Sequence, residues 1–210
     1  MISLSEILHT IAQALMIPCL IILLVLMAGA VWQIGDIVVE YIAERRKHKC
    51  NVPQLLRDVH AAGADGLADL IENSGLLRRQ KKALLELAES RGLPKDTLTA
   101  LAERLLATEE ARNARTTSIT DMIAKLGPMF GLLGTLIPLG PGIVALGQGD
   151  TVTLSESMNV AFDTTIAGVI SAAAASVISH IRKRWYNDDM VSLETLMEAV
   201  LEEVTSDVEG

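Results

Sequence analysis

Apolar residues gather in three runs, at about residues 7–34, 122–146 and 158–181. Each run holds about 20 or more residues, which at about 1.5 Å per helical residue suffices to cross a hydrocarbon core about 30 Å thick. The stretch between the first two runs is rich in Glu, Lys, Arg, Leu and Ala, which favour helices. We therefore expect an all-α, polytopic membrane protein with three transmembrane helices and a helical cytoplasmic domain.

The same pattern divides the chain into six segments. In chain order they are an outer N-terminus with transmembrane helix 1, a cytoplasmic helical domain with a stalk helix, transmembrane helix 2, a short outer loop, transmembrane helix 3 and a cytoplasmic amphipathic helix. Their predicted bounds are 1–40, 41–121, 122–147, 148–157, 158–182 and 183–210.

Basic residues flank one end of each apolar run, although the formal net charge is −8. Loops rich in Lys and Arg stay in the cytoplasm, so this distribution predicts an outer N-terminus and a cytoplasmic C-terminus. The short connection between the second and third runs is acidic, as an outer loop can be. The basic residues are Arg45, Arg46, Lys47 and Lys49, then Arg112, Arg115 and Lys125, then Arg182, Lys183 and Arg184.

Amphipathic stripes mark the segments expected outside the membrane. Leu98, Leu101 and Leu105 recur at helical spacing, and so do Leu193, Met197, Val200 and Val204. Each stripe has to be buried against another helix or a neighbouring subunit.

Little in the sequence suggests other chemistry. Cys19 and Cys50 are too far apart in the predicted topology to form a disulfide, and no cysteine or histidine spacing indicates a metal site. The sequence shows no pattern that pairs a nucleophile with a general base, and no phosphate-binding loop. Both absences disfavour an enzyme. We expect membrane lipid as a partner, and no nucleic acid.

The second run contains Pro138 and Pro141 in its outer half, with glycines beside them. Such a cluster predicts a kink or a local unwinding of the helix. In a membrane, the freed backbone groups must be satisfied by protein or water, so this helix is expected in the interior or beside a cavity. A kink that only shapes packing is an equal alternative.

Small residues predict close helix packing in the membrane. In the third run they form one stripe with Thr165, and in the second run the glycines lie three apart. Such faces allow helix backbones to approach closely. The packing residues are Gly131, Gly134, Gly168, Ala172 and Ser176, and Ser179 continues the stripe.

Asp163 lies inside the third run, where an ionisable side chain is costly and usually marks an ion pathway or a pair. Asp163 and Thr165 are about 200° apart around the helix, so they cannot line one narrow wall together. A role in the ion pathway, a pair between subunits and a protonated carboxyl remain open for Asp163.

The sequence Gly-Leu-Leu-Gly-Thr at 131–135 and the sequence Asp-Thr-Thr-Ile-Ala-Gly at 163–168 resemble those of the MotA/TolQ/ExbB family of motor channel subunits. The resemblance implies a homopentamer around two copies of a single-span ExbD/TolR/MotB-like subunit. It implies that the flow of protons, or of Na⁺, drives rotation of an inner-membrane motor. It also places Thr135 and Thr165 beside the ion. Thr164, next to Thr165, and the ionisable Asp163 are further candidates for the ion pathway.

Pro138–Gly142 and Asp163 depart from the better-known members, which leaves the choice of ion open. A scaffolding oligomer that binds partners through its cytoplasmic helices without conducting ions is the alternative. A secondary transporter is disfavoured because three spans contain no internal repeat.

Overall fold

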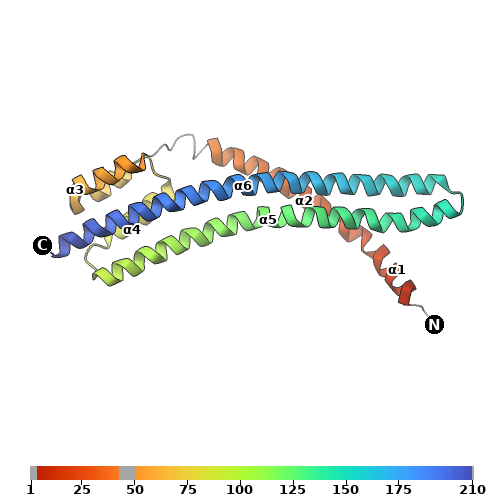
Figure 1. The fold of residues 1–210 in the computed structure, drawn as a ribbon, viewed down its shortest axis with the longest axis horizontal. Coiled ribbons are helices and arrows are strands. Elements are labelled where there is room, and N and C mark those ends of the chain that lie inside the picture. Colours follow the sequence, from red (N-terminus) through yellow and green to blue (C-terminus); the bar gives the residue numbers. More distant parts are fainter. Residues whose placement is uncertain (1–3, 43–50, 210) are drawn as a thin grey trace. The chain divides into compact units, whose positions relative to one another are not determined.

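The computed structural model describes residues 4–42 and 51–209, and every regular element in these ranges is a helix (Figure 1). Three stretches are long and apolar enough to cross a membrane, namely Glu6–Glu40, Lys95–Gly147 and Thr151–Ser206. The predicted all-α class with three membrane-spanning helices is therefore confirmed. The helices are α1 (Leu4–Ala14), α2 (Met16–Glu40), α3 (Val52–Asn73), α4 (Arg78–Glu89), α5 (Lys95–Gly147) and α6 (Thr151–Glu209).

The chain forms two compact units. We call Met1–Ile37 with Thr117–Ile181 the span unit, and Val38–Thr116 with Arg182–Gly210 the helical unit. Helices α5 and α6 contribute to both. The predicted basic cluster Arg45, Arg46, Lys47 and Lys49, together with Cys50, lies outside the described residues.

The first apolar run is divided at Leu15, where α1 ends and α2 begins. Pro18 explains the division, because a proline ring clashes with the carbonyl four residues earlier, here that of Ala14. Pro18 instead lies in the first turn of α2, where its missing N–H has no consequence.

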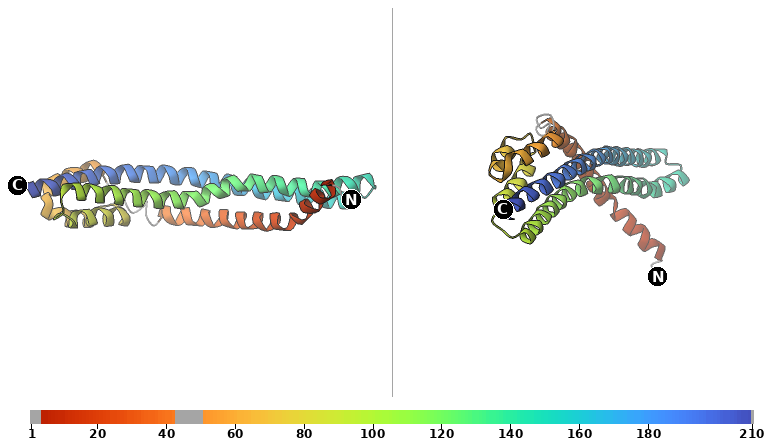
Figure 2. Two further views of the ribbon diagram at one scale, coloured as in Figure 1. Left: turned by 90° about the horizontal axis from the view of Figure 1, so that it is seen from below. Right: turned by 60° about the vertical axis from the view of Figure 1, so that its left-hand side comes forward.

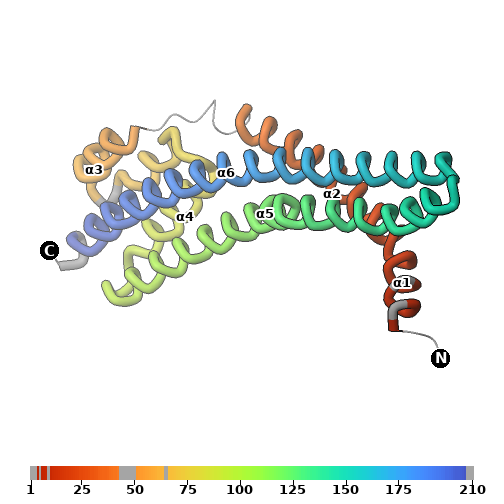
Figure 3. Tube along the Cα trace, turned by 45° about the vertical axis from the view of Figure 1, so that its right-hand side comes forward, coloured from red at the N-terminus to blue at the C-terminus, as the bar shows by residue number. Residues whose placement is uncertain are grey.

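The turn between α5 and α6 is tighter than the predicted loop 148–157, since only residues 148–150 lie outside the helices (Figure 3). Gly149 has a φ of 76°, and the N–H of Asp150 donates to the carbonyl of Ala145 at 2.9 Å, which closes α5 with a Schellman motif. The carboxylate of Asp150 then accepts from the N–H groups of Val152 and Thr153 at 3.1 Å each, and from the Thr153 hydroxyl at 2.6 Å. These bonds lower the pKa of Asp150, with the Thr153 hydroxyl contributing most. Residues 151–157 are helical because Asp150 caps them.

The predicted unwinding at Pro138 and Pro141 does not occur. Helix α5 continues through Pro128, Pro138 and Pro141 to Gly147. Pro138 is buried, so its ring fills space inside the span unit. A proline inside a membrane helix is tolerated when neighbouring groups satisfy the freed carbonyls.

Helix α6 also extends beyond its predicted end. It runs without interruption from the third span into the C-terminal segment, so the amphipathic helix predicted at 183–210 is its continuation (Figure 2). Residues 182–184 are charged, yet Arg and Lys have good helix propensity, and no Gly or Pro follows to end the helix.

The helical unit has an apolar core built from α3, α4, the first part of α5 and the last part of α6. The two predicted stripes supply its centre: Leu98 is fully buried, and Leu193, Met197, Val200 and Val204 are 1–2% exposed. Helix α3 is interrupted at Gly63, whose φ of 63° suits glycine, while Gly66 stays within the helix.

The end of α2 is joined to α6 within the helical unit. The Nε of Arg182 donates to Glu40 at 3.2 Å, and the Arg182 side chain is 1% exposed. Tyr41 stacks on Trp185 with the ring centroids 6.1 Å apart. Partial burial, and then the Glu40 carboxylate, raise the pKa of Tyr186 to about 12.

Candidate ion pathway

The span unit is organised around a close approach of α5 and α6. A Cβ on Gly168 would lie 2.5 Å from the carbonyl oxygen of Gly127 and 2.9 Å from the Cα of Gly131. Both are backbone atoms, so the two helices would have to separate to admit a side chain. Glycine at these positions is therefore required by the distance between the backbones.

Thr164 completes this contact. A Cβ on Gly134 would lie 2.6 Å from the Cβ and 2.7 Å from the Oγ1 of Thr164, which is 5% exposed. The Thr164 hydroxyl donates within its own helix, to the carbonyl oxygens of Val160 at 2.9 Å and Ala161 at 3.0 Å. Thr164 is thus held in the contact between α5 and α6.

Helix α2 packs against one side of the α5–α6 hairpin. Cys19 and Leu23 form an apolar cluster with Ile137 and the half-buried Phe130, and the Cys19 Sγ donates to the Phe130 carbonyl at 3.4 Å. On α6, Asp163, Thr164 and Ala167 border a groove of about 280 Å³ that is otherwise lined by three leucines and Met27 of α2. Phe130, Ile137, Asp163 and Ala167 therefore mark the α2 side of the hairpin.

Thr135 and Thr165 lie on the other side. At about 100° per residue, Thr135 is about 140–160° around α5 from Phe130 and Ile137. Thr165 is likewise about 160° around α6 from Asp163 and Ala167. Both threonines are half-buried. The structure therefore gives the two threonines a common face, directed away from α2, which we call the threonine face.

The hydroxyl groups of Thr135 and Thr165 each donate a hydrogen bond to a carbonyl oxygen of their own helix. The Thr135 Oγ1 donates to the Leu132 carbonyl at 2.6 Å, and the Thr165 Oγ1 donates to the Ala161 carbonyl at 3.0 Å. Each hydroxyl proton is thus used, while the oxygen lone pairs remain able to accept. Such oxygens can accept a hydrogen bond from a carboxylic acid or from water, and can coordinate a small cation.

Asp163 does not join the two threonines. Its side chain is exposed on the α2 side, and no residue within the described ranges forms a hydrogen bond or ion pair with it. The sequence predicted that Asp163 and Thr165 point to opposite sides of the helix, and the structure agrees with that prediction.

The predicted packing residues fall into two groups. Gly131, Gly134, Gly168 and Ala172 lie at the contact between α5 and α6, and Ala172 is 7% exposed. Ser176 is exposed. It lies 11 residues after Thr165, which is about 20° from the same direction, so it lies on the threonine face.

One contact was missed by the sequence analysis. The Oγ of Ser179 donates to Oδ1 of Asp121 across the hairpin at 2.5 Å. Ser179 belonged to the predicted stripe, but Asp121 was assigned to the segment before the second span. The signal that could have found the pair is that both residues are polar and lie at the same end of the predicted hairpin, Asp121 directly before the second span and Ser179 in the last turn of the third.

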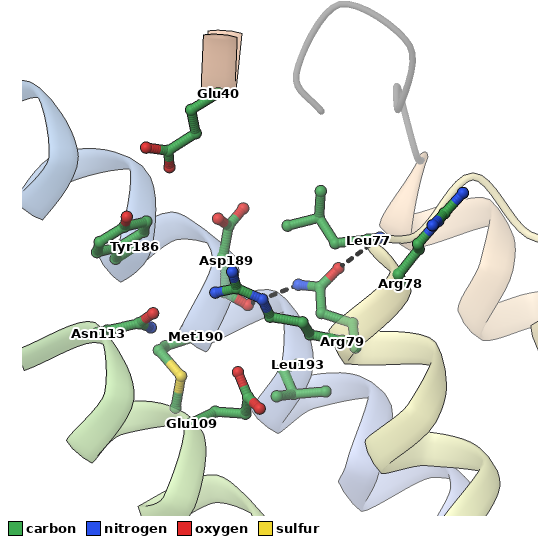
Figure 4. Close-up of a pocket in the computed structure, with 11 residues that line it drawn as sticks. Glu40, Leu77, Arg78, Arg79, Glu109, Asn113, Tyr186, Asp189, Met190 and Leu193 are labelled. Atoms are coloured by element: carbon green, nitrogen blue, oxygen red, sulfur yellow. Dashed lines mark hydrogen bonds between the residues drawn. The ribbon is translucent and has the colours of Figure 1, made fainter. Parts of the chain in front are cut away.

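A separate cavity of about 180 Å³ lies in the helical unit, between α4, α5 and α6 (Figure 4). Arg79, Glu109 and Asp189 border it, and Gln80 donates to the Asp189 carbonyl oxygen at 3.0 Å. Charges of both signs line the cavity, so it has no clear preference for an anion or a cation. We do not assign it to the ion pathway.

Three apolar helices, two of them in a glycine-packed hairpin, define an α-helical membrane protein. The chain belongs to the MotA/TolQ/ExbB proton channel family, whose sequence profile matches residues 70–195. It is therefore a multi-pass membrane protein of a non-enzymatic inner-membrane family. A comparison with curated proteins found no match.

Proposed function

We propose that the chain is the ion-conducting subunit of an inner-membrane rotary motor that converts proton-motive force into mechanical work. The family associates with ExbD/TolR/MotB subunits, which supports a pentamer of this chain around two copies of such a single-span partner. The N-terminus would lie outside and the helical unit in the cytoplasm, as the basic flanks of the spans indicate.

The observation that supports this function is the threonine face. Thr135 and Thr165 come from two helices, are half-buried and face away from α2. A partner helix against this face would bring its acidic side chain to two hydroxyl oxygens. These oxygens can accept from the protonated acid and hold a relay water, which lowers the cost of taking a proton through the membrane.

The test is proton flux into proteoliposomes that contain the chain with its co-purified single-span subunit. Flux is followed with a trapped pH-sensitive dye under an imposed membrane potential. Thr165→Val retains shape but removes the hydroxyl, so we expect flux to fall about tenfold or more, because a lost hydrogen-bond partner costs about 1–3 kcal/mol. Thr135→Val is expected to act in the same direction.

Thr164→Val is the matched control. It is the same substitution one residue away, at a side chain that packs on Gly134, and it should leave flux near the wild-type value. If Thr165→Val conducts like the wild type in an intact complex, the threonine face is not the pathway. If the wild-type complex does not conduct at all, the scaffolding alternative replaces the motor.

A further inference from the structure

The polar residues at the inner end of the span unit form one layer. Gln33 is one turn after Ala30, Thr120 is one turn before Ile123, and Ser179 is one turn after Ala175. Ala30, Ile123 and Ala175 belong to one buried apolar cluster, so the three polar residues lie next to that cluster on its inner side. Buried polar groups within membrane helices are costly and usually have a function.

Two features of this layer point to exchange with water or an ion. The Thr120 side chain is fully buried, and its hydroxyl has no hydrogen-bond partner among the residues that the structure describes. The next residue, Asp121, is half-buried and accepts from Ser179, itself 4% exposed, at 2.5 Å. A buried hydroxyl with unused hydrogen-bonding capacity, one residue before a carboxylate in the chain, suits a bound water.

The Asp121–Ser179 pair continues the threonine face. Asp121 lies 14 residues before Thr135, and Ser179 lies 14 residues after Thr165. Fourteen residues bring a straight helix to within about 40° of the same direction, and closer if the packed helices supercoil. The pair is therefore about 21 Å along the hairpin from the threonines.

Between these two levels, the same face of α6 carries Ser176, whose exposed hydroxyl can bind water. The apolar cluster of Leu26, Ala30, Ile123 and Ala175 fills the interior of the three-helix unit at this depth. A hydrated route would therefore run over the threonine face and not through the bundle.

We propose that Asp121 is a second proton-carrying carboxylate of this channel, contributed by this chain at the inner end of the threonine face and held by Ser179. This inference rests on the proposed function. A proton arriving on a water forms an O–H bond with the Asp121 carboxylate as the O–H bond of that water breaks. The reverse transfer then releases the proton to water on the inner side.

Two substitutions separate this role from a purely structural one. In Asp121→Asn, the side-chain carbonyl can still accept from Ser179, but the side chain no longer takes a proton. In Ser179→Ala, the hydrogen bond is lost while the carboxylate remains. A proton carrier requires the larger loss of flux from Asp121→Asn, whereas a structural lock requires it from Ser179→Ala.

The experiment measures proton flux in the same proteoliposomes, with the assembly of each variant checked by native mass spectrometry. We expect Asp121→Asn to lower flux about a hundredfold, the lower end of what a positioned proton-transfer group contributes. Asp188→Asn, an exposed carboxylate of α6 in the helical unit, is the control and should conduct like the wild type.

The outcomes are distinct. Suppose the wild type conducts. If the proton flux of Asp121→Asn then equals that of Asp188→Asn, or if Ser179→Ala loses more flux than Asp121→Asn, the role of Asp121 is overturned and the proposed function stays intact. A wild type that does not conduct overturns both. Loss of flux in Asp121→Asn within an intact complex, larger than in Ser179→Ala, supports the proposal.

Discussion

At the scale of single residues, the span unit distinguishes two adjacent threonines. Thr164 is buried against Gly134, while Thr165 is half-buried and faces away from α2. The two side chains have the same chemistry, but they are about 100° apart on α6. Because the distance between backbones is set by Gly127, Gly131 and Gly168, these glycines also determine which threonine reaches the threonine face.

We expect Gly168→Ala to destabilise the span unit. The new methyl group would meet the Gly127 carbonyl oxygen at 2.5 Å, so the hairpin would have to open at a cost of about 1–3 kcal/mol. Thermal unfolding of the detergent-solubilised protein measures the effect. Gly35→Ala on α2 is the control, because a Cβ there has nothing within 4 Å. Equal unfolding temperatures for the two variants would contradict a tight helix contact.

At the scale of elements, the helical unit links the end of α2 to α6 through charged and aromatic side chains. Arg182 is almost completely buried and Glu40 is 16% exposed, so the pair is removed from water. The stack of Tyr41 on Trp185 lies on the same two segments. These contacts fix which turn of α6 lies beside the end of α2.

We expect Arg182→Ala to be strongly destabilising, by about 3–5 kcal/mol, because it leaves a partly buried carboxylate without its partner. The double variant Arg182→Met with Glu40→Leu should recover most of that loss, since an apolar pair of similar size needs no compensating charge. Chemical unfolding followed by tryptophan fluorescence reports on the pair through Trp185. A double variant as unstable as Arg182→Ala would argue against a buried pair.

At the scale of the whole molecule, a single copy leaves large apolar side chains of all three spans exposed. Leu24 of α2 is 61% exposed, Ile143 of α5 is 63% exposed and Phe162 of α6 is 58% exposed. Lipid can cover such residues, but the exposed carboxylate of Asp163 among them is costly in lipid. Contact with another protein chain would remove part of that cost.

We therefore expect native mass spectrometry of the complex, expressed with its genomic neighbours, to give a pentamer of this chain with two copies of a small single-span protein. The pentamer alone would retain the ring and show that the partner was lost. A monomer or a dimer would leave no central pathway and would contradict the proposed assembly.

Much of the fold follows from the sequence because its signals are local. Runs of about 20 apolar residues predict spans, and stripes such as Leu193, Met197 and Val200 predict a buried helix face. Local signals were less reliable at element ends. Pro138 and Pro141 suggested a local unwinding, but α5 continues through both prolines. The loop was predicted to reach residue 157, but it ends at Asp150, whose side chain caps α6.

The three spans, the family resemblance and the opposition of Asp163 to Thr165 could be predicted without a structure, because they depend only on hydrophobicity, motif and helical angle. Three further features required the structure: the side of the hairpin that α2 occupies, the contact of Thr164 with Gly134, and the pairing of Asp121 with Ser179. The physical reason is that these contacts join residues far apart in the chain. Their pairing depends on the axial register of the glycine-packed helices, that is, on which residues lie at the same height along the two helices. The periodicity within one helix does not determine this register.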